Sequence, residues 1–268
     1  MNGGDQAALI RRYRTARRDP GLAVLEGFHA LKHALRFGGD VVEAVAADPR
    51  ELRELAGELA PDLGDSLVER TTPVGAGVLA ELVPQAPRTG VVAIARRPEV
   101  DAGEVLADSR PSPLVLLEDP RTMGNMGACV RVAAAADAGG VLTTGPNDPW
   151  HPDALRGAAG LHFALPVVAL APFRLMGRER GQGGEGRSEL DRLARVDRPL
   201  VAIDPGGEDL RSVELPPRAI LAFGTERHGL SADLLERADV RLGIPMREGV
   251  SSLNLATAVA AVLFAQRL

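Results

Sequence analysis

The chain has 268 residues, of which 45% are hydrophobic and 25% are charged, and its formal net charge is −5. This is the composition of an ordinary globular protein with room for one large or two modest domains, and the acidic balance does not by itself indicate a nucleic-acid partner. The single cysteine, Cys129, excludes an intramolecular disulfide framework and a multi-cysteine metal site. Because no run approaches the ~20 apolar residues that cross a bilayer, we expect a soluble cytoplasmic protein.

The first twenty residues are polar and contain the basic stretch RRYRTARR. A helix of this kind can lie along an RNA backbone, although a solvated helix face explains the pattern equally well. The candidate RNA-binding residues here are Arg11, Arg12, Arg14, Arg17 and Arg18.

Residues 22–95 have the pattern of a small mixed α/β unit. Apolar runs predict strands, and amphipathic spacing predicts helices, in this part of the chain. The expected strands are residues 22–27, 41–48, 67–70 and 90–95, and the expected helices are residues 28–38 and 51–59. His29 and His33 share one of these helices but lack a third ligand, so no metal site is expected. We expect a first domain at residues 1–96 and a charged, proline-bounded linker at residues 97–112.

From residue 113 to residue 268, strands alternate with helices, which is typical of a parallel sheet with helices on its faces. The uninterrupted apolar run PLVLLEDP indicates a strand that is buried on both faces. The expected strands are residues 113–120, 141–145, 163–170, 199–204, 219–223 and 240–244. Helices are expected after the turn near residue 125, after Pro152, at residues 190–196, after Ser231, and from Ser251 or Ser252 to the C-terminus, with a glycine-rich surface insertion at residues 177–189.

Three groups of glycine and polar residues follow strands in this second domain. Ligands of an open α/β sheet collect beyond the carboxyl ends of its strands, so these groups are the candidate site. The first group places Asn125 in a strand-to-helix turn and Arg131 farther along the helix, and the second, FGTERHGLS, places Glu226 in a loop. In the third group, IPM followed by SSLN, Ser252 and Asn254 could simply cap a helix.

In this order, the three groups resemble the motifs of the SpoU (TrmH-type) RNA ribose methyltransferases. The first family motif, Asn-x-Gly-x3-Arg, matches residues 125–131, although Asp137-Ala138 replaces the aromatic often found before the final glycine. The second, Gly-x-Glu-x-x-Gly-Leu, matches residues 224–230, and the third, Ile-Pro-Met followed by Ser-Leu-Asn, matches residues 244–254. The opening VLEGFHALKHAL resembles, more weakly, the small substrate-binding domain, similar to a ribosomal-protein fold, that precedes many catalytic domains of this family.

The resemblance implies a knotted α/β catalytic domain that binds S-adenosylmethionine and methylates a ribose 2′-hydroxyl of RNA without a metal. It also implies a homodimer, for which the apolar last helix is a candidate interface. The cofactor-binding residues implied are Thr144, Phe223, Gly224, Glu226, Ile244, Met246, Ser252 and Leu253. The catalytic residues implied are Arg131, Asn125, Glu226, Ser252 and Asn254, and Arg131 would also contact the RNA.

A guanidinium is effectively always protonated, so Arg131 is expected to orient a phosphate and stabilise the developing alkoxide instead of acting as the base. Ribosomal RNA is favoured over tRNA as the substrate, because a small N-terminal domain precedes the catalytic unit. One alternative is a non-catalytic RNA-binding protein with the same fold. Another is a nucleotide-dependent oxidoreductase or NTPase, but the sequence lacks both G-x-G-x-x-G after a strand and G-x4-G-K-[ST].

Overall fold

The computed structural model describes residues 3–170, 196–225 and 227–265. The chain divides into two compact units, and each is built from two separate stretches of sequence. The first unit comprises Met1–Glu99 and Trp150–Ala164, and the second comprises Val100–Pro149 and Leu165–Leu268. The segment Trp150–Ala164, which lies within the sequence of the predicted second domain, therefore belongs to the first unit.

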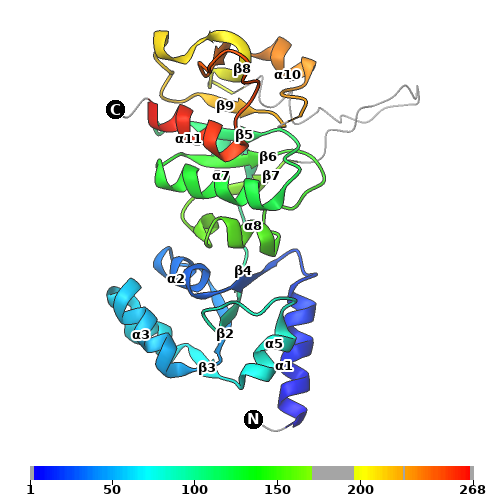
Figure 1. The fold of residues 1–268 in the computed structure, drawn as a ribbon, viewed down its shortest axis with the longest axis vertical. Helices are drawn as coiled ribbons and strands as arrows, with labels where there is room; N and C mark the ends of the chain where they lie inside the picture. The colour runs from blue at the N-terminus through cyan, green and yellow to red at the C-terminus, as the bar shows by residue number, and fades with distance from the viewer. Residues whose placement is uncertain (1–2, 171–195, 226, 266–268) are drawn as a thin grey trace, which may run out of the picture. The chain divides into compact units, whose positions relative to one another are not determined.

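The first unit contains a four-stranded mixed sheet in the order β1-β4-β2-β3 (Figure 1). Strand β4 is antiparallel to both of its neighbours, whereas β2 and β3 are parallel. The strands are β1 (Leu22–Glu26), β2 (Val41–Ala46), β3 (Thr71–Pro73) and β4 (Val91–Arg96). The helices are α1 (Gly3–Ala16), α2 (Phe28–Arg36), α3 (Pro49–Leu59), α4 (Gly64–Glu69), α5 (Ala76–Leu82) and α8 (Pro152–Gly157), with short 3-10 turns at Pro61–Leu63 and Leu161–Phe163.

Helix α1 is part of the core of this unit. Leu9 and Tyr13 on its inner face are fully buried against Val24 and Val92 of the sheet. The Tyr13 hydroxyl donates a hydrogen bond to the Val92 carbonyl oxygen over 3.1 Å, and burial raises the pKa of this hydroxyl. The basic N-terminal segment is therefore packed as an integral helix of the first unit.

Close contacts hold the segment Trp150–Ala164 within the first unit. A Cβ at Gly160, whose φ is +76°, would lie 2.6 Å from the Ala30 Cα, so only glycine permits this approach to α2. His33 of α2 donates a hydrogen bond from Nδ1 to the Ala159 carbonyl oxygen over 2.7 Å. The carboxylate of Glu26, whose side chain is 1% exposed, pairs with the guanidiniums of both Arg17 and Arg156. These two ion pairs connect the chain at the end of α1, the end of β1 and helix α8 through the one buried carboxylate of Glu26.

The second unit is a six-stranded sheet in the order β10-β8-β9-β5-β6-β7, in which every neighbouring pair is parallel. This confirms the predicted α/β class and parallel sheet. The strands are β5 (Leu114–Leu117), β6 (Gly140–Thr143), β7 (Val167–Ala169), β8 (Leu200–Asp209), β9 (Ile220–Phe223) and β10 (Val240–Gly243). The helices are α6 (Ala102–Ala107), α7 (Met123–Ala135), α10 (Ala232–Arg237) and α11 (Leu255–Ala265), with a 3-10 turn at Leu210–Ser212.

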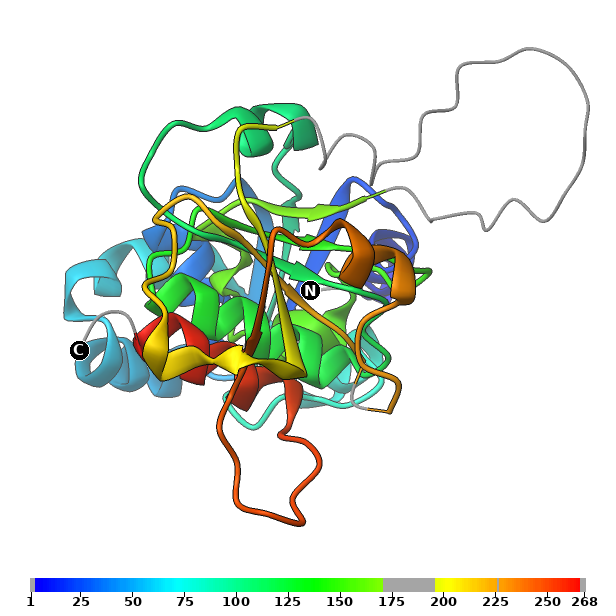
Figure 2. The same ribbon diagram turned by 90° about the horizontal axis from the view of Figure 1, so that it is seen from above.

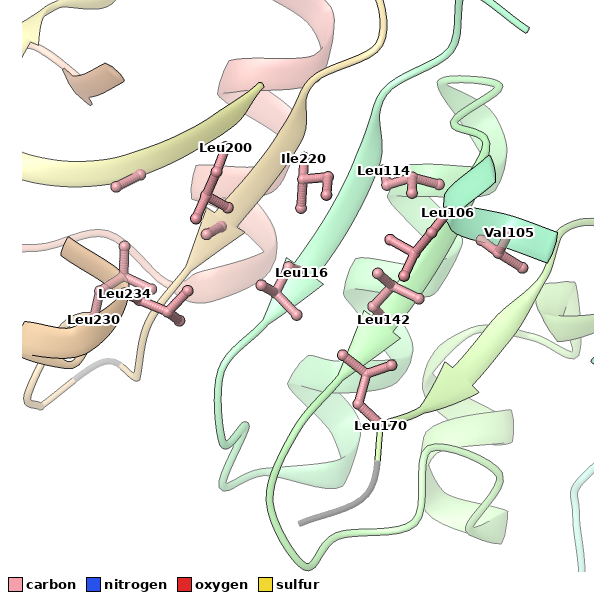
Figure 3. Close-up of a cluster of buried hydrophobic side chains, with 12 residues drawn as sticks. Val105, Leu106, Leu114, Leu116, Leu142, Leu170, Leu200, Ile220, Leu230 and Leu234 are labelled. Carbon is pink, nitrogen blue, oxygen red and sulfur yellow. The ribbon is translucent and has the colours of Figure 1, made fainter. Parts of the chain in front are cut away.

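Helices cover both faces of this sheet. On one face, leucines of the sheet pack against Leu106 of α6 and Leu234 of α10 (Figure 3). On the other face, α7 and α11 lie side by side (Figure 2). Strands β5 and β9 are entirely buried between these layers, as expected for central strands of a parallel sheet.

The predicted linker at residues 97–112 is partly helical. It contains α6, whose Val105 and Leu106 are buried in the core of the second unit. Arg198, only 4% exposed, fixes the chain after α6 by donating to the carbonyl oxygens of Leu106, Asp108 and Ser112 over 2.6–3.0 Å. Arg198 also donates to the carbonyl oxygen of Arg218 over 3.2 Å.

Three local predictions differ from the structure. The predicted strand at residues 67–70 is wrong, because these residues end helix α4 and the strand that follows is β3. Helix α5 was not predicted at all. The last helix begins at Leu255, not at Ser251 or Ser252, because Asn254 caps it: the Asn254 Oδ1 accepts a hydrogen bond from the backbone N–H of Ala256 over 3.0 Å.

The insertion predicted at residues 177–189, most of the helix predicted at residues 190–196, and the last three residues lie outside the described residues. Within the part of the chain that is described, no helix is both long and apolar enough to cross a membrane.

Candidate active site

A pocket of about 260 Å³ lies at the carboxyl ends of β8, β9 and β10. Most of its wall consists of apolar side chains and of backbone in glycine-containing loops. The second and third sequence motifs contribute Phe223, Gly224, Ile244, Met246, Ser252 and Leu253 to the wall. A largely apolar pocket with a few polar groups is suited to a small organic ligand with a flat apolar part.

The second motif forms a tight loop after β9. Thr225 and Gly229 exchange two backbone hydrogen bonds of 2.9 and 3.1 Å, and the Thr225 hydroxyl accepts a third from the His228 N–H. A Cβ at Gly224 would lie 2.0 Å from the Gly229 carbonyl carbon. Glycine is thus required here because the loop folds back on its own backbone, and not only because the residue borders the pocket.

The end of this loop is anchored to the centre of the sheet. The Ser231 hydroxyl accepts a hydrogen bond from the Leu234 N–H and caps α10, the helix that the sequence predicts after Ser231. The Ser231 N–H donates to the Glu118 carboxylate over 2.7 Å, and Glu118 directly follows β5. Sequence reasoning did not identify Glu118, because its role depends on a contact across 113 residues.

The first and third motifs meet through their asparagines. Asn254 Nδ2 donates to Asn125 Oδ1 over 3.1 Å, which joins the residue after Leu253 to the first turn of α7. This bond fits the close packing of α7 against α11 (Figure 2). Residues 129 positions apart in the sequence therefore lie together beside the pocket.

Three of the predicted site residues are placed elsewhere or are not described. Arg131 lies on α7, exposed to solvent, and is not part of the pocket wall. Thr144 is also outside the wall, because its buried hydroxyl accepts a hydrogen bond from the Asp119 N–H over 3.0 Å. Glu226 lies outside the described residues.

The basic residues of the N-terminal segment fall into two groups. Arg12 pairs with Glu43 over 2.6 Å, and Arg17 pairs with the buried Glu26. Arg11, Arg14 and Arg18 are exposed, and the structure gives them no ion pair within the described residues. Arg11 and Arg14 are three residues apart and share one side of α1, whereas Arg18 follows the end of this helix.

Sequence reasoning missed four polar residues of the pocket wall, namely Asp204, Thr225, Arg227 and Ser251. Asp204 ends the strand predicted at residues 199–204, so its position at a carboxyl strand end was the available signal. Among the described residues, no cluster of histidine, cysteine or acidic side chains could hold a metal ion.

Residues 112–264 match the model of the SpoU rRNA Methylase family. The chain belongs to this family. The match covers more than half of the chain and contains all three motifs, the pocket and the paired asparagines.

Individual relatives match between about half and nearly all of the chain. The chain is 30% identical over 262 residues to a Synechocystis sp. protein that is named an uncharacterized tRNA/rRNA methyltransferase, and the match covers 94% of this chain and 85% of the relative. It is 31% identical over 153 residues to the 23S rRNA (uridine(2479)-2′-O)-methyltransferase of Streptomyces viridochromogenes, which covers 56% of this chain and 50% of that protein. The crystal structure of an RNA 2′-O ribose methyltransferase superposes with a TM-score of 0.71 at 28% identity, covering 99% of this chain and 96% of the other.

Proposed function

We propose that this SpoU-family protein transfers a methyl group from S-adenosylmethionine to a ribose 2′-hydroxyl of RNA, and that the RNA is ribosomal. The observation that carries the proposal is the hydrogen bond between Asn125 and Asn254, which assembles the first and third motifs beside the pocket. Relatives named as 23S rRNA 2′-O-methyltransferases support ribosomal RNA as the substrate. Methylation of tRNA is the alternative within the same chemistry.

The pocket wall fits an adenosyl ligand. Phe223, Ile244, Met246 and Leu253 supply apolar surface for a flat base, and Gly224, Thr225 and Ser252 line the same pocket. S-adenosylmethionine, when bound, supplies a methyl group already activated by its sulfonium.

The task left to the protein is to position the ribose hydroxyl and to stabilise the oxygen as it loses its proton. Arg131 is always protonated, so it serves this step by binding the neighbouring phosphate and stabilising negative charge on the oxygen. Asn254, held by Asn125, and the nearby Ser252 orient the ribose. Glu226 completes the proposed catalytic set.

The first unit would bind the RNA. The exposed side chains of Arg11 and Arg14 on α1, and of Arg18 just after it, offer three positive charges. Because Arg12 and Arg17 already pair with carboxylates, they contribute less to a phosphate-binding surface than the sequence suggests.

We also propose a homodimer through α11. This helix is apolar on nearly every side, and Phe264 on its outer surface is 38% exposed. The trefoil knot that the family resemblance implies remains a prediction for this chain.

The proposal is tested with S-adenosylmethionine carrying a labelled methyl group and unmodified transcripts of rRNA and of tRNA. We expect label in rRNA, in dinucleotides that resist alkaline hydrolysis because their 2′-oxygen is methylated. Arg131→Ala should lower this transfer by about 100-fold or more, as loss of a transition-state donor does. Calorimetry should show unchanged affinity for the methyl donor.

The control is Arg121→Ala, which removes another exposed arginine of the same unit, one that pairs with Asp119. Normal turnover by Arg131→Ala would contradict the assigned active site. Binding of the donor without transfer to either RNA would favour the non-catalytic alternative. Binding of NAD or ATP in place of the donor would contradict the proposed chemistry.

A further inference from the structure

Asp204 has a position in the pocket that no sequence motif marks. The preceding residue, Ile203, is the last residue of β8 that pairs with β9, opposite Phe223. Asp204 therefore lies at the carboxyl edge of the central strands, and its half-buried side chain is part of the pocket wall. Among the described residues of that wall it supplies the sole carboxylate, and Arg227 is the other charged side chain.

The carboxylate of Asp204 is held in place by its own turn. Its Oδ1 accepts a hydrogen bond from the Gly206 N–H over 2.9 Å. Its Oδ2 has no hydrogen-bond partner within the described part of the chain. One oxygen thus orients the group, and the other is available to a ligand.

The neighbours of Asp204 indicate which part of a ligand it would meet. Its carbonyl oxygen would lie 3.3 Å from a Cβ at Gly243, the residue before Ile244. Ile203 and Ile244 thus flank it with the apolar wall suited to a purine. In a nucleoside, the group bonded to the purine is the ribose, which presents two neighbouring hydroxyl donors.

We propose that the Asp204 carboxylate accepts hydrogen bonds from the ribose hydroxyls of adenosyl ligands and thereby sets the affinity of the pocket for the methyl donor. The inference rests on the proposed function, since it assigns one part of the S-adenosylmethionine site. The chemical basis is general: acidic side chains at carboxyl strand ends bind ribose hydroxyls in dinucleotide-binding sheets. Arg227 carries only donors, so it cannot supply this acceptor.

The test compares wild type with Asp204→Asn by calorimetry, using S-adenosylhomocysteine and 5′-methylthioadenosine. Asparagine keeps an oxygen for the Gly206 N–H, so the turn is retained, but it replaces the second acceptor with a donor. We expect both ligands to bind about 10- to 100-fold more weakly, the range for loss of hydrogen bonds to a charged group. The melting temperature without ligand should not change.

The matched control is Glu208→Gln, which neutralises another acid of β8 that is not part of the pocket wall. Its affinity for both ligands should equal that of wild type. 5′-Methylthioadenosine lacks the amino-acid group of S-adenosylhomocysteine. If Asp204→Asn weakened the binding of S-adenosylhomocysteine alone, Asp204 would contact the ammonium group, and the proposal would be overturned.

Unchanged binding of both ligands to Asp204→Asn, with normal binding by wild type, would overturn this inference and leave the proposed function intact. Failure of the wild-type protein to bind either adenosyl ligand would overturn both.

Discussion

The two units each bury a charged side chain, and they stabilise it in opposite ways. In the first unit, the Glu26 carboxylate is neutralised by two guanidiniums, from Arg17 and Arg156. In the second, Arg198 is surrounded by four carbonyl oxygens, and burial, reinforced by the neighbouring Arg218, lowers the pKa of its guanidinium.

The comparison shows what each charge does for its unit. Glu26 forms ion pairs with segments that are remote in sequence, so it connects α1, β1 and α8. Arg198 donates hydrogen bonds to carbonyl oxygens of an irregular segment. These oxygens have no partner within a described helix or strand, so a side chain has to supply the donor. One unit uses buried charge to assemble elements, and the other uses it to hold a connection in place.

The largest effect on stability is expected for Arg198→Met. Methionine keeps much of the side-chain length but removes the donor from the carbonyl oxygens of Leu106, Ser112 and Arg218. The carbonyl oxygen of Asp108 keeps a hydrogen bond from Arg218 over 3.2 Å. Each orphaned buried acceptor costs about 1–3 kcal/mol. Because removal of the charge also removes the cost of its desolvation, we expect the free energy of unfolding to fall by about 3–5 kcal/mol. Urea unfolding followed by far-ultraviolet circular dichroism measures it.

Arg241→Met is the matched control for Arg198, because Arg241 also donates to a carbonyl oxygen, that of Leu235, but is exposed. Its effect should stay within about 0.5 kcal/mol. Equal losses in the two variants would show that burial of Arg198 is not the cause.

The next largest effect is expected for Glu26→Ala, which leaves two guanidiniums facing each other. Loss of one member of a buried pair costs about 3–5 kcal/mol, but solvent screens the half-exposed Arg156, so we expect about 2–4 kcal/mol. Trp150 and Tyr13 are the single tryptophan and tyrosine of the chain, and both lie in the first unit. Fluorescence during urea unfolding therefore reports on this unit specifically.

Glu43→Ala serves as the comparison for Glu26, because it breaks the more exposed pair with Arg12. An exposed pair contributes at most about 1 kcal/mol. If Glu43→Ala destabilised the first unit as much as Glu26→Ala, the buried charge of Glu26 would not be what connects the segments of this unit.

The smallest effect on stability is expected when Arg11, Arg14 and Arg18 are all replaced by glutamine. These side chains are exposed, so the free energy of unfolding should change by less than about 0.5 kcal/mol. RNA affinity should nevertheless fall, and the slope of log affinity against log salt should become shallower by about one for each phosphate that the variant no longer neutralises. Filter binding at several salt concentrations measures both.

Replacing Arg50, Arg53 and Arg70 by glutamine makes the same change in net charge at other exposed positions of the first unit. RNA affinity that fell equally in the two triple variants would mean that charge alone, and not the α1 surface, binds RNA.

The sequence predicted the architecture of the second unit well, because its central strands are continuous apolar runs bounded by glycine and proline. It failed where short elements depend on their neighbours. Residues 67–70 have a strand-like composition but complete helix α4, and the strand pairing belongs to Thr71–Pro73, which adds to β2 at the sheet edge. The start of α11 depends on one side-chain cap at Asn254.

The sequence indicated the pocket only where family motifs mark it. The motifs predict Phe223, Ile244 and Leu253 as wall residues. They do not mark Arg227, which a local pattern cannot distinguish from a surface charge, and they do not mark Asp204, for which the end of a predicted strand is the one signal. The assignment of Trp150–Ala164 to the first unit was equally inaccessible. It depends on Gly160, His33 and Glu26, which are recognised as partners only when the chain is folded.

The assignment of Trp150–Ala164 to the first unit determines where the protein can be divided into fragments. A fragment that begins at Val100 would keep α8 but lose every partner in residues 1–99, so the fully buried Ala154, Leu155 and Ala158 would face water. Such a fragment would be prone to aggregate for a reason unrelated to its catalytic sheet. An independent catalytic module requires excision of Trp150–Ala164 and a short bridge from β6 to β7, so the molecule has to be divided at three points along its backbone.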